Sequence, residues 1–348
     1  MRLFNKNILL ALALLAAAQG CDKEPVTPQD TGAPIMLSAT ETGTKALLEN
    51  GTFNKNGNRL VIYDYVDNST TPYFVDQIGP DVPGNNYGYT GVWPFVNEPH
   101  QWTPGVHKFF GWLAKDANFD NPDTEDDDES MTTEAFFALN DNSFNEATKV
   151  LSIPAKEITK ETPQFDFLYS NIISTEAQQE PVGLTFSHLF TAFRITALNR
   201  DPESTITIKS ITLSGLKTLK SAIIDFSGSE PTVTYTTSGG SSDFAFTFDA
   251  TVGTLNTQAK AITDAYLLWP QKQSDFLGVT MSINWDHTID GQTSQNSRPE
   301  IPLGSALEWN AGVVNSLNIE FDLDQITFYI NSLEEWNHNN NKDIIIGL

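Results

Sequence analysis

The 348-residue sequence contains a single cysteine, Cys21. No disulfide can form within one chain, so the fold must be stabilised by burial of apolar side chains. No apolar run approaches the ~20 residues that a membrane-spanning helix needs. Apolar residues at helical spacing are also missing from every longer window, and only Thr132–Leu139 is a candidate helix. The absences exclude a disulfide scaffold, a helical bundle and a helical membrane protein.

Basic residues are scarce: 20 Lys and Arg stand against 44 Asp and Glu, which gives a net charge of −24. Such a surface repels the phosphates of nucleic acids and of anionic lipid headgroups. The acidic run Asp123–Glu129 lacks the turn glycine and the ligand spacing of a calcium loop. We therefore expect no nucleic-acid partner and no metal site, and we interpret the charge as that of a solvated extracellular surface.

Catalytic motifs are absent as well. The sequence has no G-x-S-x-G, H-E-x-x-H, P-loop or G-x-G-x-x-G pattern. Its five histidines show no metal-ligand spacing, and His188 is interpreted as a partly buried, hydrogen-bonded strand residue. We expect no enzyme and no cofactor. A hydrolase with two carboxylates facing each other across a cleft stays open as an alternative, because that separation is a property of the folded chain.

The N-terminal segment has the pattern of an export signal. Two basic residues precede the apolar run Ile8–Ala18, which predicts a signal peptide over residues 1–20. Its end, Ala18–Cys21, resembles a bacterial lipobox, although Gln19 is larger than the residue usual at that position. Cys21 is therefore a candidate lipidation site, whose acyl chains, such as palmitate, anchor the protein to a membrane. The alternative is a free or buried thiol.

From residue 35 onward the sequence is typical of β-structure. Short β-branched and aromatic runs such as Leu60–Tyr65 and Ile206–Leu213 are separated by turn signals such as Asp290-Gly291. Without a βαβ rhythm, this pattern indicates antiparallel β-sandwiches, and the length indicates two domains. The predicted organisation is a polar tether over 21–34, an N-terminal sandwich over 35–180, a C-terminal sandwich over 181–323 and a strand extension over 324–348.

Several motifs occur in a fixed order: Asn58–Tyr65, Trp93-Pro94, Lys108–Gly111, Gln164–Ser170, Leu184–Phe193, Tyr266–Pro270 and Trp309–Gly312. Together with the lipobox they resemble the fimbrillin family of Bacteroidetes, the major and accessory subunits of fimbriae. The resemblance implies two transthyretin-like β-sandwich domains, where periodicity alone indicates only sandwiches. It further implies a lipoprotein precursor at the outer membrane that polymerises with other fimbrial subunits and mediates adhesion to an unidentified host or glycan ligand.

The C-terminal extension is too apolar for a solvated tail. Ile326, Phe328 and Ile330 alternate in one strand-like run, and Ile344 and Ile346 lie in a second. These residues complete either the protein's own sandwich or that of a neighbour. The family resemblance, in which a C-terminal extension acts as donor strand, favours the neighbour.

The resemblance also implies a processing site near the N-terminus. In the family a first strand is removed by a protease that cleaves after a basic residue, often within Thr-Arg-Ala. Thr44-Lys45-Ala46 occupies that place here. Lysine is a departure, because a pocket selective for arginine reads a planar, bidentate group that lysine lacks. Cleavage between Lys45 and Ala46 is therefore a hypothesis.

Tryptophan offers an alternative function, because indole rings stack on sugars. Most tryptophans lie beside predicted strands, which favours core packing; the seven are Trp93, Trp102, Trp112, Trp269, Trp285, Trp309 and Trp336. The competing hypothesis is a monomeric, surface-anchored glycan-binding lipoprotein. In such a protein Asp343–Leu348 packs on its own domain.

Overall fold

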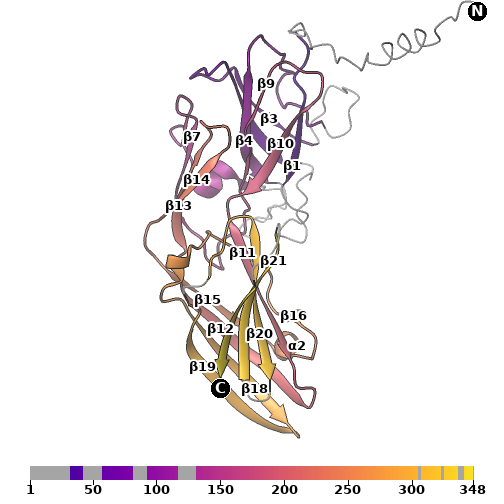
Figure 1. The fold of residues 1–348 in the computed structure, drawn as a ribbon, viewed down its shortest axis with the longest axis vertical. Helices are drawn as coiled ribbons and strands as arrows, with labels where there is room; N and C mark the ends of the chain where they lie inside the picture. The colour runs from indigo at the N-terminus through magenta and orange to yellow at the C-terminus, as the bar shows by residue number, and fades with distance from the viewer. Residues whose placement is uncertain are drawn as a thin grey trace, which may run out of the picture.

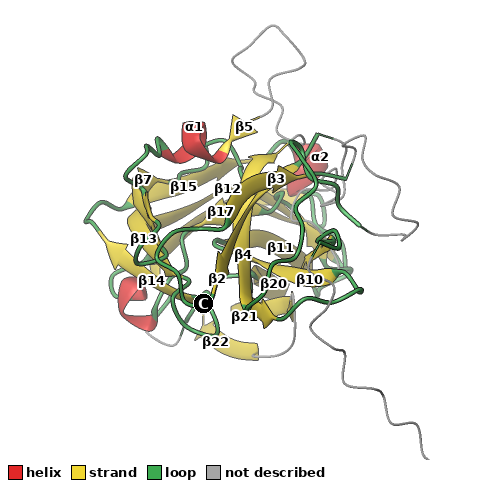
Figure 2. Ribbon diagram, turned by 90° about the horizontal axis from the view of Figure 1, so that it is seen from above, coloured by secondary structure: helices red, strands yellow, loops and turns green. Residues whose placement is uncertain are grey.

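The computed structural model describes residues 32–41, 57–80, 92–116, 131–304, 307–322, 325–335 and 341–347. These residues form two β-sandwiches stacked along the long axis of the molecule (Figure 1). Figure 2 looks down that axis and shows the short helices α1 (Thr133–Phe137) and α2 (Ala250–Gly253) at the periphery of the strands. No helix in these ranges is long and apolar enough to cross a membrane. Cys21, Lys45, Ala46 and Trp336 lie outside the described residues.

The first sandwich faces an eight-stranded sheet against a four-stranded one. The larger sheet has the order β1-β10-β8-β4-β2-β3, with β5 and β9 paired to β4, and the smaller has the order β14-β13-β7-β6. The bounds are β1 Leu37–Glu41, β2 Arg59–Val66, β3 Phe74–Ile78, β4 His107–Asp116, β5 Met131–Thr132, β6 Phe144–Asn145, β7 Val150–Glu157, β8 Leu168–Ser170, β9 Ile173–Thr175, β10 Val182–His188, β13 Leu219–Asp225 and β14 Thr232–Thr237.

The second sandwich is built from a six-stranded and a four-stranded sheet. The former has the order β16-β11-β20-β21-β22, with β17 paired to β11, and the latter has the order β15-β12-β18-β19. The bounds are β11 Thr191–Asn199, β12 Ser204–Leu216, β15 Ser242–Thr247, β16 Lys260–Ala261, β17 Tyr266–Leu268, β18 Thr280–Ile289, β19 Gln292–Pro302, β20 Val313–Asp322, β21 Gln325–Glu335 and β22 Asn341–Gly347. Two short helical segments accompany them, α2 and the single turn η1, Gln273–Phe276.

The predicted all-β sandwich class is confirmed, and its period-two patterns explain the cores. In β10, Val182, Leu184, Phe186 and His188 are all buried, while the residues between them are half-buried or exposed. Alternate side chains of a strand point to opposite faces, so β10 presents one side to the first core. Not every pairing is antiparallel, because β1 pairs with β10 and β11 pairs with β20 in parallel.

The predicted helix is also present, as α1 over Thr133–Phe137. Thr132 caps it, accepting a hydrogen bond at its hydroxyl from the Ala135 amide at 3.1 Å. The helix ends at Ala138 in the left-handed conformation, with φ of 54°. Phe136 and Phe137 are buried in the first core, so this single turn is held by packing more than by its own length.

The expected boundary between residues 180 and 181 does not separate the two cores. β10, β13 and β14 all follow residue 181 in the sequence, yet they belong to the sheets of the first sandwich. Leu184 of β10 and Ile224 of β13 are buried in the same cluster as Leu60 and Phe110. A short apolar run reveals that it is a strand but not which sheet it joins, since sheet pairing is a long-range interaction.

A buried lysine connects the two sandwiches. Lys220 lies on β13 and is 2% exposed. Its Nζ donates to the Pro270 carbonyl and to Asp275 Oδ2, each at 2.6 Å. Burial lowers the pKa of Lys220, an effect that the Asp275 carboxylate opposes. The contact attaches a strand of the first sandwich to η1 of the second.

Candidate functional site

The edge strand β1 is the strand of the first sandwich that another strand could most readily replace. It pairs in parallel with β10, from Leu37 opposite Val182 to Glu41 opposite Phe186. Its other side faces residues 92–102, where the Trp93 amide donates to the Leu37 carbonyl at 2.9 Å and the Ile35 amide donates to the His100 carbonyl at 2.8 Å. We call the space between β10 and residues 92–102, which β1 occupies, the β1 slot.

The apolar side chains of this segment are part of the first core. Ile35, Leu37 and Ala39 are 1%, 0% and 7% exposed, and all three belong to the main apolar cluster. Because they lie at alternate positions, they point to the same face. Removal of β1 would therefore leave an apolar groove with unpaired backbone groups along both of its walls.

His188, at the end of β10, connects three segments through one imidazole ring. Its Nδ1 donates to Asp166 Oδ2 at 2.7 Å, and its Nε2 lies 3.0 Å from Glu41 Oε1. Asp166 precedes β8, and Glu41 is the last residue of β1. The His188 side chain is fully buried, and those of Glu41 and Asp166 are each 15% exposed, so both contacts are largely shielded from water.

The charges of this cluster favour a protonated histidine. Burial by itself lowers the pKa of His188, but the carboxylates of Asp166 and then Glu41 outweigh it and raise the pKa to about 9. Ligand atoms of the three residues lie within 4.8 Å of one another, close enough for a metal ion. Both ring nitrogens already contact a carboxylate, however, so a proton suits this arrangement better than a metal does. We call His188, Asp166 and Glu41 the ionic clasp, because their contacts hold the end of β1 against β10.

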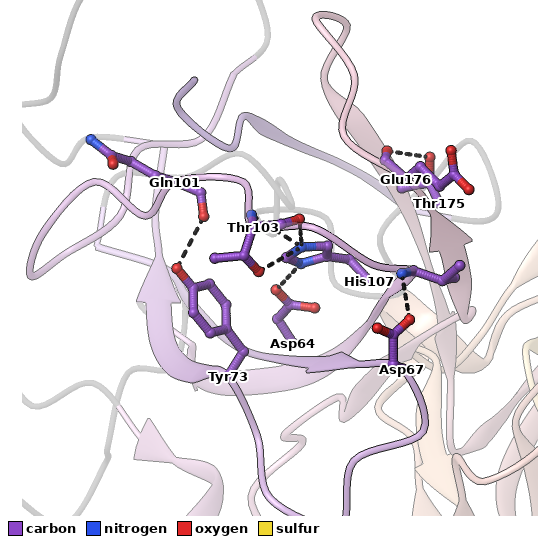
Figure 3. A network of polar contacts seen from close by, with 9 residues as sticks. Asp64, Asp67, Tyr73, Gln101, Thr103, His107, Thr175 and Glu176 are labelled. Atoms are coloured by element: carbon purple, nitrogen blue, oxygen red, sulfur yellow. Dashed lines mark hydrogen bonds and ion pairs between the residues drawn. The ribbon is translucent and has the colours of Figure 1, made fainter. Parts of the chain in front are cut away.

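A second buried histidine supports the wall of the slot (Figure 3). His107 Nδ1 donates to Asp64 Oδ2 at 2.6 Å, and Nε2 donates to the Thr103 carbonyl at 3.0 Å. Nearby, the Val106 amide donates to Asp67 Oδ1 at 2.9 Å. These bonds hold residues 103–106 against β2, directly after the segment that pairs with β1.

Asp64, His107 and Thr103 are an acid, a histidine and a hydroxyl residue in contact, as in a catalytic triad. They do not act as one. The side chains of Asp64 and His107 are 0% exposed. The hydrogen bond with Asp64 raises the pKa of His107 against the effect of burial. Both ring nitrogens have partners within the protein. A fully buried imidazole with both ring nitrogens engaged cannot reach a substrate to take its proton, and the group is structural.

The C-terminal strands form a hairpin on the second sandwich. β21 pairs antiparallel with β20, and β22 pairs antiparallel with β21 at the edge of that sheet. The register places Ile326 opposite Phe321 on one side and opposite Ile346 on the other, and it places Phe328 opposite Ile344. Ile326 is 3% exposed within the second core. Ile330 lies opposite Leu317.

The tryptophans do not form a sugar-binding surface in the described part of the chain. The six that are described are 6% exposed or less and lie in the two cores. An open cavity of about 490 Å³ lies on the second sandwich, beside α2, with Lys160, Phe246, Phe248, Asp249 and Tyr266 in its lining. No tryptophan lines this cavity, so it offers no indole ring on which a sugar could stack.

Two partners in the clasp were missed by the sequence reasoning. Glu41 and Asp166 are single acidic residues among 44, and nothing in their local sequence distinguishes them. The available signal was His188 itself, which occupies an inward position of an otherwise apolar alternation. A buried polar group needs partners, which predicts that acidic or carbonyl groups lie nearby but not which ones.

Several solved structures are similar to this chain at low sequence identity. A candidate cell adhesion protein of Bacteroides uniformis is 15% identical, with a TM-score of 0.47 over 87% of this chain and 99% of that one. A second, from Bacteroides ovatus, is 14% identical, with a TM-score of 0.44 over 88% and 99% of the two chains. A fimbrial assembly protein of Parabacteroides distasonis is 8% identical, with a TM-score of 0.38 over 90% and 99%.

No curated protein matches the sequence. A family model does match, and it contains the four later motifs, from Gln164–Ser170 to Trp309–Gly312, whereas the three earlier ones precede it. It is described as fimbrillin-like and covers residues 126–336, which is more than half of the chain. The chain belongs to the fimbrillin-like family.

Proposed function

We propose that this protein is a structural subunit of a cell-surface fimbria that assembles with other fimbrial subunits by exchange of strands. The observation that carries the proposal is the β1 slot. β1 is an edge strand of the larger sheet, and its apolar residues complete the first core. Removal of β1 would create the kind of groove that a strand from another subunit fills.

The C-terminal hairpin is the proposed donor. β22 is an edge strand, and β21 is held to the second sandwich by β20 on one side and by β22 on the other. Ile326, Phe328 and Ile330 alternate along β21, which is the pattern an apolar groove accepts. Ile344 and Ile346 repeat the pattern on β22.

Export and processing complete the proposal. The precursor is acylated on Cys21 and held at the outer membrane by lipid, with residues 21–34 as tether. Cleavage between Lys45 and Ala46 would separate β1 from the rest of the chain, since both residues follow Glu41 closely in the sequence. The assembled filament would then carry out adhesion, in keeping with a fimbrillin-like protein that acts structurally and not as an enzyme.

A disulfide lock tests the exchange of β1. Ser38 lies opposite Gly183 in the β1–β10 register, and a Cβ on Gly183 would lie 3.6 Å from Ser38 Oγ. The variant Ser38→Cys/Gly183→Cys, in a Cys21→Ser background, should therefore form a disulfide that retains β1 after cleavage of the chain at residue 45. We expect no SDS-resistant ladders or filaments under oxidising conditions, and recovery of both after reduction.

The single variants Ser38→Cys and Gly183→Cys are the controls, and each should assemble under both conditions. Electron microscopy and denaturing gels provide the measurement. Assembly of the oxidised double variant to the same extent as the controls would reject strand exchange at β1. In that case the subunits assemble through another surface. Failure of the parent chain itself to assemble would instead favour the surface-anchored monomer, in which the C-terminal hairpin stays on its own sandwich.

A further inference from the structure

The β1 slot fits a strand with a particular order of side chains, and alternating apolar residues alone do not meet that requirement. The four alternate positions that it receives from β1 and the segment before it are Ile35, Leu37, Ala39 and Glu41. The first two are large and apolar, the third is small, and the fourth carries the carboxylate that meets His188. An occupant that fits must repeat this order: two large apolar residues, one small residue and one acid.

His188 makes the acid important. Both of its ring nitrogens face carboxylates, and these two groups, Glu41 from β1 and Asp166 from the segment before β8, raise its pKa. If β1 leaves, the Asp166 contact stays and the Nε2 proton loses the Glu41 carboxylate. Loss of an acceptor from a buried, charged donor is unfavourable. The vacated slot therefore selects for a strand that brings a carboxylate to the same place.

The chain itself contains such a strand. Reading β21 in the N-to-C direction, alternate positions carry two large apolar residues, a small residue and an acid, in the order Phe328, Ile330, Ser332 and Glu334. The spacing matches that of the four β1 positions throughout. Glu334 also lies in a bulge of its own sheet, because Val313 pairs with Glu335 while Val314 pairs with Leu333.

We propose that the occupant of the β1 slot is the segment Phe328–Glu334 of a second copy of this chain. It binds parallel to β10, as β1 does, with Glu334 in the place of Glu41 beside His188. The proposal rests on the proposed function and adds to it the partner, the strand direction and the register. The carboxylate contact with His188 sets the register, since a shift by two residues toward the N-terminus of β21 places an uncharged side chain there.

One other register of this segment also brings an acid to His188, but it has no small residue. Read in the opposite direction, Asp324, Ile326, Phe328 and Ile330 would place an acid beside His188 in an antiparallel strand. That register puts Ile326 where Ala39 lies and reverses the observed direction of β1 on β10. Overpacking a core position with a larger side chain is destabilising, so the parallel register is favoured.

Cross-linking between two copies distinguishes these registers. The parallel register places Asn331 of one copy opposite Gly183 of another, where Ser38 lies now, and the antiparallel register places Thr327 there. In full-length chains with Cys21→Ser, cleaved at residue 45, Gly183→Cys is mixed with either Asn331→Cys or Thr327→Cys and oxidised. We expect intermolecular disulfides from the Asn331→Cys mixture alone. Thr185→Cys mixed with Asn331→Cys is the control that is two residues out of register.

A second variant tests the carboxylate. Glu334→Gln should slow the formation of SDS-resistant ladders at least about tenfold. Glu335→Gln is the control, because neighbouring residues of a strand point to opposite faces, and it should leave the rate unchanged.

Filaments with a cross-link through Thr327, or with no cross-link at Gly183, would overturn this inference and leave the proposed function standing. An equal rate for the two Gln variants would overturn the role of the carboxylate. Failure of every variant and of the parent chain to assemble would reject the proposed function and this inference with it.

Discussion

Gly111→Ala is expected to destabilise the first sandwich strongly, although it adds only one methyl group. Gly111 lies on β4 opposite Ile62 of β2, in the middle of the larger sheet. A Cβ at this position would lie 2.1 Å from the Val61 carbonyl oxygen and 2.8 Å from Ile62 Cδ1. The nearer contact is with backbone, so β2 and β4 would have to separate. We expect a loss of about 3 kcal/mol or more in the free energy of unfolding.

Gly183→Ala is the matched control, because it is also a glycine on a strand of the same sheet. A Cβ there meets only Ser38 Oγ, at 3.6 Å, which is ordinary contact. Its free energy of unfolding should stay within about 1 kcal/mol of the parent chain. Urea denaturation followed by tryptophan fluorescence compares the two variants. If both are equally stable, the close approach of β2 and β4 at Gly111 is not a constraint on this fold.

The second large effect is a loss of stability at alkaline pH that originates at His188. The pKa of this histidine is raised in the folded protein from its ordinary 6.5 to about 9. The protonated form is therefore favoured by folding. Its contribution is fully present below pH 6.5 and is lost as the pH rises through about 9. This shift means that the folded protein stabilises protonated over neutral His188 by about 3 kcal/mol. The free energy of unfolding should fall by about that amount across this pH window.

Glu41→Gln isolates the part of this effect that belongs to β1. The amide keeps the shape of the side chain but removes one of the two carboxylates that raise the pKa of His188. The pKa of His107 is raised as well, through Asp64, and that contribution is common to both proteins. We expect a shallower fall in stability for Glu41→Gln between pH 6.5 and 9.

Denaturation in urea at a series of pH values measures both curves, and hydrogen exchange of the β1 amides locates the change. Exchange at β1 should accelerate as the pH rises, by more than the intrinsic rate, in the parent chain. Parallel curves for the parent chain and Glu41→Gln would mean that the Glu41 carboxylate does not interact with His188. A curve that rises with pH would contradict the assigned charge state of the histidine.

Sequence alone determined the class of the fold, because that depends on local pattern. Alternating runs such as Ile206–Leu213 and repeated turn signals predict strands, and the structure contains them. The short helix after Thr132 and the burial of the described tryptophans follow from the same local chemistry. Ordered motifs identified the family, which the match over residues 126–336 confirms.

Tertiary structure alone decided which strands share a core and which side chains meet. β13 and β14 belong to the first sandwich, although their place in the sequence predicts that they belong to the second. Glu41 and Asp166 reach His188 from distant points in the sequence. The physical reason is the same in both cases: hydrogen bonding between strands and ion pairing in a core act between neighbours in space. A local pattern specifies that a strand has an apolar face or that a buried histidine needs acceptors, whereas the folded chain selects the partner.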